Sequence, residues 1–238
     1  MIHWLAGSPD RARRDMQDAL RFSAELNHPA TTIIASYFGG WVHHQRGERE
    51  AGLSLFEQTY SIAKRFGSPR YMEYAEVILR CLRGERLALD AMDEMHAKLN
   101  SIRWPSWQKV FSVCVLAQSY ADCGHAGRGL QMLRTTAGES TQSCIASEVP
   151  RLQGELLMRL AKPDPVEAER CLREAIALAR KQESKSLELR AATSLARLLA
   201  GAGRSDEARS ALAGIYGSFT EGFDTADLKS ARAVLDGL

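Results

Sequence analysis

The chain has 238 residues, a formal net charge of +2 at pH 7 and 45% hydrophobic residues, which is ordinary for a globular protein with a buried core. This balance argues against a disordered chain and against a strongly basic surface for nucleic acid. No apolar run reaches the roughly 18–20 residues of a membrane span, and the first residues do not resemble a secretory signal. Five scattered cysteines without a CxxC pair fit a reducing compartment. We therefore expect a cytoplasmic protein without nucleic-acid or membrane partners.

The predicted elements are helices that recur with a period of about forty residues. Each copy has a small residue, a large apolar residue four positions later, and a small or apolar residue three positions after that. Offsets of four and seven lie on one helical face, so each copy marks one amphipathic helix. The copies begin at Ala12, Ala51, Ala88, Gly129, Ala168 and Ala208. The copy at Ala51 is the weakest, because polar Gln58 takes its last position.

A second helix is predicted upstream of most copies. Its small-residue markers are Gly39, Ala117, Gly154 and Ala196. Glycine turns separate most of the paired helices, and no stretch shows the alternation of a strand. The units are predicted over residues 1–28, 29–68, 69–104, 105–143, 144–182 and 183–220, with a capping helix over 225–236. The predicted fold is a single all-α domain, an α-solenoid wound as a right-handed superhelix of about six antiparallel helix pairs.

The small-apolar spacing and the turn glycines resemble the tetratricopeptide repeat, in a form longer than its usual unit of about 34 residues. Residues 167–198 and 215–229 are also similar to the C-terminal repeats of large bacterial signalling proteins. Those proteins carry a class III adenylate or guanylate cyclase or a DNA-binding region, followed by a P-loop ATPase module. The resemblance implies a role in sensing and protein contact within bacterial signal transduction.

The sequence predicts neither an enzyme nor a cofactor or metal site. It has no GxxxxGK[ST] loop for a nucleotide phosphate, so the catalytic activities of the similar proteins are not carried over. His43 and His44 are adjacent, and neighbours on a helix point about 100° apart, so they cannot share one metal. Trp104 and Trp107 flank Pro105 and are expected to pack between neighbouring helix pairs. The alternative is an exposed aromatic anchor for a peptide.

In such solenoids the first helices line the concave face, and positions near their small-residue markers are expected to face it. These candidate positions are Ser36, Gly40, His43, Glu73, Val77, Arg80, Cys114, Gln118, Arg151, Glu155, Arg190, Thr193 and Arg197. Four arginines against two glutamates make the predicted groove mildly basic. Arginine suits carboxylates, so the expected ligand is an acidic protein or peptide segment or a C-terminal carboxylate. The alternative is pairing within a helix, such as Arg151 with Glu155.

The resulting hypothesis is a non-catalytic protein- or peptide-binding scaffold or sensor. One alternative is a small-molecule sensor that regulates a cyclase or ATPase, which a pocket around Val77, Phe111 and Cys114 would favour. Another is a homodimerisation module. The segment from Met1 to Leu5 looks like the last turn of a helix whose beginning is missing, so the N-terminal edge is expected to be open. The chain would then be a fragment, or a partner or second copy would cover that edge.

Overall fold

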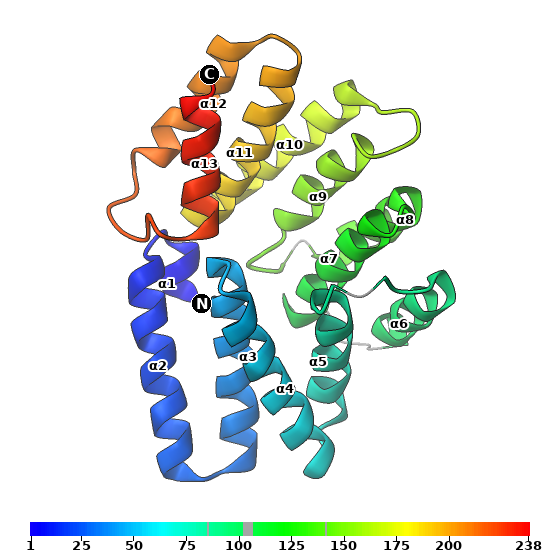
Figure 1. Ribbon diagram of the computed structural model, residues 1–238, viewed down its shortest axis with the longest axis vertical. Helices are drawn as coiled ribbons and strands as arrows, with labels where there is room; N and C mark the ends of the chain where they lie inside the picture. Colours follow the sequence, from blue (N-terminus) through cyan, green and yellow to red (C-terminus); the bar gives the residue numbers. More distant parts are fainter. Residues whose placement is uncertain (85, 102–106, 141) are drawn as a thin grey trace.

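A computed structural model describes residues 1–84, 86–101, 107–140 and 142–238. Within these ranges it contains thirteen α-helices and no strand (Figure 1). The helices in chain order are α1 (Ile2–Leu5), α2 (Pro9–Leu26), α3 (Pro29–Arg46), α4 (Arg49–Arg65), α5 (Pro69–Leu82), α6 (Leu89–Ser101), α7 (Trp107–Asp122), α8 (Ala126–Ser140), α9 (Glu148–Leu157), α10 (Pro165–Lys181), α11 (Lys185–Gly201), α12 (Ser205–Tyr216) and α13 (Ala226–Asp236). Consecutive helices pack as pairs, which confirms the predicted all-α solenoid.

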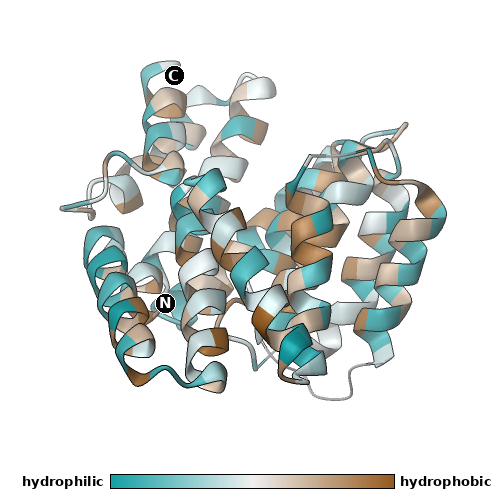
Figure 2. Cartoon of the chain, turned by 60° about the horizontal axis from the view of Figure 1, so that its bottom comes forward, coloured by the Kyte–Doolittle hydropathy of each residue, from teal (hydrophilic) through white to brown (hydrophobic). Residues whose placement is uncertain are grey.

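Local sequence explains where several helices begin and end. Proline occupies the first turn of α2, α3, α5 and α10, where its missing N–H costs no hydrogen bond. At the end of α3, Gly47 adopts a left-handed φ of 81°, which a residue with a side chain rarely tolerates. In Figure 2 the helices carry both hydrophobic and hydrophilic residues around their circumference, as stacked amphipathic helices require.

The small-residue markers lie where helices approach each other closely. A Cβ atom added to Gly129 of α8 would lie 2.6 Å from the carbonyl oxygen of Ala117 in α7. One added to Gly154 of α9 would lie 2.7 Å from Cγ of Leu172 in α10. Both distances are shorter than van der Waals contact, so a larger residue would push the two helices apart. The repeat pattern therefore reports the contact between paired helices.

The two ends of the stack meet over part of the N-terminal edge. The rest of that edge is open, since Phe22 of α2 is 53% and Ile34 of α3 is 45% exposed beside an apolar hollow. Helix α1 packs against α11, and α13 packs against α3 (Figure 1). Trp4 is only 2% exposed, and its carbonyl oxygen accepts a 2.5 Å hydrogen bond from Ser186 Oγ, 182 positions away. The C-terminal units thus cover Trp4 and the adjoining part of this edge, and the expectation that a partner or a second copy covers the rest stays a prediction. Helical periodicity cannot predict this contact, because it describes only neighbours within a few turns.

Of the helices in the described ranges, none combines the length and the apolar character that crossing a membrane would require.

Candidate ligand-binding cavity

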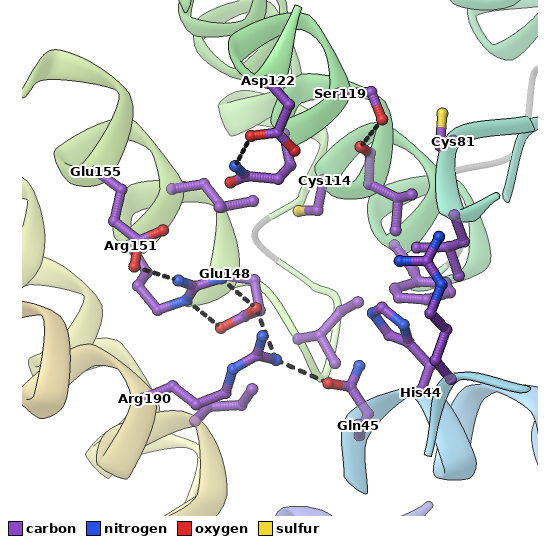
Figure 3. A pocket seen from close by; sticks show the side chains of 18 of the residues that line it. His44, Gln45, Cys81, Cys114, Ser119, Asp122, Glu148, Arg151, Glu155 and Arg190 are labelled. Carbon is purple, nitrogen blue, oxygen red and sulfur yellow. Dashed lines mark hydrogen bonds and ion pairs between the residues drawn. The ribbon is translucent and has the colours of Figure 1, made fainter. Parts of the chain in front are cut away.

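The first helices of the units surround a cavity of about 380 Å³ on the inner side of the stack (Figure 3). Most of its lining comes from α3, α5, α7, α9 and α11, as expected for a solenoid whose first helices form the concave face. The lining residues are His44, Gln45, Arg49, Cys81, Leu82, Gly84, Phe111, Cys114, Val115, Gln118, Ser119, Asp122, Ile145, Glu148, Arg151, Leu152, Glu155, Leu187 and Arg190. Two walls of different chemistry can be distinguished.

One wall is apolar. Leu82 of α5 and Phe111 and Val115 of α7 form most of it, and Ile145 and Leu187 continue it toward the opposite wall. Phe111 and Val115 are also members of the main hydrophobic core, so this wall is the inner edge of that core. A rigid apolar surface of this kind suits an aliphatic or aromatic group of a ligand.

The opposite wall is ionic and centres on the buried carboxylate of Glu148 in α9. Arg151 donates to both of its oxygens at 2.8 and 2.9 Å, and Arg190 of α11 lies 3.0 Å away (Figure 3). Burial by itself would raise the pKa of Glu148, but the charges of Arg151 and Arg190 outweigh it and hold the pKa at about 2. The carboxylate is therefore ionised at neutral pH and compensated within the protein.

This ionic network connects four helices. Arg190 donates to Gln45 Oε1 of α3 at 2.8 Å and lies 3.6 Å from Asp227 of α13. Glu155 of α9 accepts from Arg151 at 2.7 Å and from Ser194 Oγ of α11 at 2.6 Å. Burial raises the pKa of Asp227, while the charge of Arg190 opposes the shift. The N-terminal, middle and C-terminal units thus meet in one set of polar contacts.

His44 lies between the two walls. Its ring packs edge-on against Phe111, with the ring centroids 5.4 Å apart. Burial lowers the pKa of His44 to about 4, and the positive charge of Arg190 adds to this effect. The imidazole is therefore neutral at pH 7. His43 points elsewhere and pairs with Glu48, and the described residues contain no group of three His, Cys, Asp or Glu side chains that could hold a metal ion.

Five of the residues predicted for the groove line this cavity. They are Cys114, Gln118, Arg151, Glu155 and Arg190. Two others, Thr193 and Arg197, line a smaller adjoining hollow of about 170 Å³, which shares Arg151, Glu155 and Arg190 with the cavity. The rule that positions near the small-residue markers face the inner side, here called the positional rule, therefore places residues at the cavity on the helices of the later units, α7, α9 and α11.

The rule fails for α3 and α5, which present other positions to the cavity. Ser36 is buried against Thr59 of α4, with their hydroxyl oxygens 2.8 Å apart, and Gly40 packs on the Phe56 ring. Val77 is also buried in the core. A Cβ atom at Gly39, the marker of α3, would lie 2.8 Å from Cδ1 of Leu55 in α4. Of the other predicted groove residues, His43, Glu73 and Arg80 do not line the cavity.

Sequence reasoning missed Glu148, His44 and Gln45, although it placed Arg151, Glu155 and Arg190 in the groove. Glu148, Arg151 and Glu155 are spaced three and four positions apart, a pattern that places them on one helical face and could have identified the network. The alternative interpretation of Arg151, pairing with Glu155, is confirmed by their 2.7 Å ion pair. No sequence pattern near His44 or Gln45 identifies them as site residues. They line the cavity because the curved stack brings α3 close to α9 and α11.

The cavity is not basic overall. Its three arginines face three carboxylates, those of Asp122, Glu148 and Glu155. Arg151 and Arg190 are already paired with carboxylates of the protein. Arg49, at the start of α4, has no ion pair with any described residue, so it is the arginine of the lining that can meet a ligand carboxylate.

The tryptophan motif lies partly outside the described residues, which exclude 102–106. Trp107 is described and packs inside the structure. Its ring lies 5.8 Å from that of Tyr37, 4.9 Å from Phe38 and 5.7 Å from Trp41, measured between centroids. These contacts join α7 to α3. Trp107 thus packs inside the structure as expected, but between units 29–68 and 105–143, which are not neighbours along the chain.

Comparison with known proteins supports the repeat fold. Residues 189–213, in α11 and α12, match the tetratricopeptide repeat family. The HTH-type transcriptional regulators MalT of Yersinia pestis (strain Pestoides F) and of Yersinia pseudotuberculosis (serotype O:1b) are each 34% identical over 70 residues. Those residues make up 29% of this chain and 8% of the regulators, so the chain matches only a small part of these relatives.

A solved structure extends the similarity to nearly the whole chain. The crystal structure of NprR in complex with its cognate peptide NprX superposes with a TM-score of 0.63 at 16% sequence identity. The match covers 92% of this chain and 66% of the NprR chain. The chain therefore has the fold of a tetratricopeptide-like helical solenoid.

Proposed function

We propose that this chain is a non-catalytic protein- or peptide-binding module of a cytoplasmic bacterial signalling protein, and that its ligand occupies the central cavity. The observation that carries the proposal is the pairing of an apolar wall with an ionic wall on the inner face of the stack. A peptide offers both kinds of group within a few residues. The fold of NprR, solved with a peptide, and the similarity to a transcriptional regulator support this setting.

The two walls define the chemistry of the proposed ligand. An aliphatic or aromatic side chain would pack against Leu82 and Phe111, which removes apolar surface from water. A carboxylate, from an acidic residue or a peptide C-terminus, would meet Arg49, since Arg151 and Arg190 are already neutralised. The ligand is thus a short peptide segment with one apolar residue and one carboxylate.

A small-molecule ligand that regulates a linked cyclase or ATPase is the second candidate. The volume of about 380 Å³ falls within the range of small-molecule sites. Phe111 and Cys114, two of the three residues expected around such a pocket, line the cavity, whereas Val77 is buried in the core. Thermal-shift measurements with a panel of carboxylic metabolites would identify such a ligand.

Selection from a displayed library of random peptides tests the main proposal. Peptides selected on the unchanged protein are measured against Gln118→Trp, which places an indole ring in the cavity. Gln131→Trp, on the exposed surface of α8, is the matched control. We expect affinity to fall at least about tenfold for Gln118→Trp and to stay unchanged for the control, and equal binding by both variants would refute the cavity as the site.

The role of Arg49 is tested with the same peptides in two forms. Peptides with a free C-terminal carboxylate or an acidic residue should lose affinity on Arg49→Gln, because a charge-assisted hydrogen bond is removed. Forms in which every carboxylate is replaced by an amide should bind both proteins equally. If the amide forms bind as tightly as the acids, the carboxylate requirement is wrong.

A further inference from the structure

A polar cluster holds the N-terminal and C-terminal units together, and we call it the clasp. It consists of Asp10, Arg46, Glu48, Glu221, Gly222 and Asp224. Its centre is Arg46, which is only 2% exposed although it carries a charge. The guanidinium group lies 3.0 Å from Asp10, 2.8 Å from Glu48 and 3.3 Å from Asp224, and so joins α2, the α3–α4 turn and the segment before α13.

The clasp also satisfies backbone groups on both sides. Glu221 Oε1 accepts hydrogen bonds at 3.0 Å from the backbone N–H groups of Asp10 and Arg11, in the first turn of α2. In return, the backbone N–H of Gly222 donates to Asp10 Oδ2 at 3.0 Å. N–H groups at the start of a helix lack partners within it, so Glu221 caps α2 from the far end of the chain.

The fit between the two segments leaves no space for a side chain. Gly222 has a φ of +77°, and a Cβ atom there would lie 2.0 Å from Cγ of Pro9. Gly203 has a similar φ of +74°, but a Cβ atom there would meet nothing within 4 Å. A side chain would therefore strain the left-handed backbone equally at both glycines. Only at Gly222 would it also collide with the N-terminal unit.

The contact between the N-terminal and C-terminal units depends on the positive charge of Arg46. Four carboxylates gather at the clasp, and the basic groups beside them are Arg46, His43, which pairs with Glu48, and the more distant Arg13, 3.9 Å from Glu48. Without Arg46 the carboxylates of the two ends would repel each other. Apolar contacts accompany these charges, because Trp4 is buried in one hydrophobic core with Leu187 of α11, and a Cβ atom at Gly47 would lie 2.6 Å from Cβ of Ala226 in α13.

The clasp and the cavity share the same short segments. Arg46 directly follows Gln45, and Asp224 lies three residues before Asp227. Both Gln45 and Asp227 contact Arg190 in the ionic wall. Separation of the clasp would withdraw these two partners from Arg190, so opening of the ring would alter the ligand-binding wall.

We propose that the clasp is a gate for the cavity: the solenoid exchanges between this closed ring and an open form in which the N-terminal and C-terminal units separate. This inference rests on the proposed ligand-binding function. A ligand that fills the cavity lies against Gln45 and Arg190 as well as the apolar wall and Arg49. It binds the closed form better, because only that form presents Gln45 and Arg190 together. Ligand binding therefore favours closure, and closure raises the affinity for ligand by the same factor.

The gate is tested first without ligand, by small-angle X-ray scattering of the full chain. Gly222→Ala should increase the radius of gyration and the maximum dimension, while Gly203→Ala, the matched control, should leave both unchanged. Circular dichroism must show equal helix content in the two variants. If Gly222→Ala fails to fold, Glu221→Ala, which removes the acceptor that caps α2, replaces it in the same measurement. A folded variant with the dimensions of the unchanged protein would overturn the clasp.

The coupling is tested next with a peptide selected on the unchanged protein. Its affinity for Glu221→Ala should fall about tenfold, within the usual range of allosteric coupling, and should not change for Gly203→Ala. A variant that opens the ring but binds the peptide with unchanged affinity would overturn the gate and leave the binding function intact. If no peptide binds the unchanged protein, the proposed function fails, whereas the scattering result still decides whether the clasp closes the ring.

Discussion

The two hydrophobic cores of this solenoid are built from different residues. The core of α1–α9 contains large aromatic side chains, among them Trp4, Tyr37, Trp41, Phe56 and Tyr74, all essentially buried. The core of the C-terminal units, α10–α13, is made almost entirely of alanine, leucine and isoleucine, with one phenylalanine. The repeat-family match, at residues 189–213, lies entirely in the second region.

This difference in core residues explains why the repeat pattern is easier to recognise in the C-terminal units than in the N-terminal ones. Alanine and leucine pack in nearly the same way in every unit, so the unit keeps a recognisable pattern. Interlocking aromatic rings pack according to their individual shapes and orientations, so each position is specific to this chain. The cavity is lined almost entirely by the first region, and the second region adds Leu187 and Arg190 of α11.

The largest expected effect is the loss of an aromatic ring at the centre of the first core. Trp41 packs edge-on against Trp4 and Trp107, with centroids 5.2 and 5.7 Å away. Trp41→Ala should lower the free energy of unfolding by about 4 kcal/mol, because it leaves a large void. Leu212→Ala, in the C-terminal core, should cost about 3 kcal/mol. Urea denaturation compares the two, and a larger loss for Leu212→Ala would contradict the central role of the aromatic cluster.

A second effect concerns acid stability. The unfolded chain binds a proton at His44 with a pKa near 6.5, whereas the folded protein does so only near pH 4. Between these values the unfolded state holds more protons, so stability falls as the pH drops from 6.5 toward 4. The full loss is roughly 3 kcal/mol. Unfolding measured at several pH values should show a smaller acid loss for His44→Gln, and an unchanged loss would contradict the buried neutral imidazole.

The smallest of these effects tests the close approach of paired helices. Gly129→Ala should lower the free energy of unfolding by about 2 kcal/mol, because its Cβ meets the Ala117 carbonyl oxygen of the backbone. Gly39→Ala should change stability by less than about 1 kcal/mol, because its Cβ meets only the end of the Leu55 side chain, and alanine favours the helix. Thermal unfolding of both variants provides the comparison. Equal losses of unfolding free energy in the two variants would show that the helices approach each other equally closely at Gly129 and at Gly39.

Much of the site could be predicted where the repeat is regular. The positional rule placed Cys114, Gln118, Arg151, Glu155 and Arg190 at the cavity because α7, α9 and α11 share one rotation in the stack. On α3 and α5 the corresponding positions are buried instead, Ser36 against Thr59 of α4 and Val77 in the core. A single sequence contains no measure of helix rotation, so the failure could not be seen in advance.

The ionic wall illustrates the other missing information. The pair of Arg151 with Glu155 follows from helical spacing and was available from the sequence. The contact of Glu148 with Arg190 joins two helices, and that of Arg190 with Gln45 joins residues 145 positions apart. These contacts neutralise the arginines that made the predicted groove basic. Net charge along the sequence is therefore a poor guide to the charge that a ligand meets.

The amino-acid sequence by itself determined the helices, their pairing and their stacking, because these depend on periodicity, small residues at close contacts and residues that begin or end a helix. Tertiary structure alone decided that the two ends meet, that Arg46 is buried between them, and which side chains enclose the cavity. The physical reason is distance along the chain. Small rotations between successive units add up over the whole stack, and their sum, which no local pattern records, determines which distant residues touch.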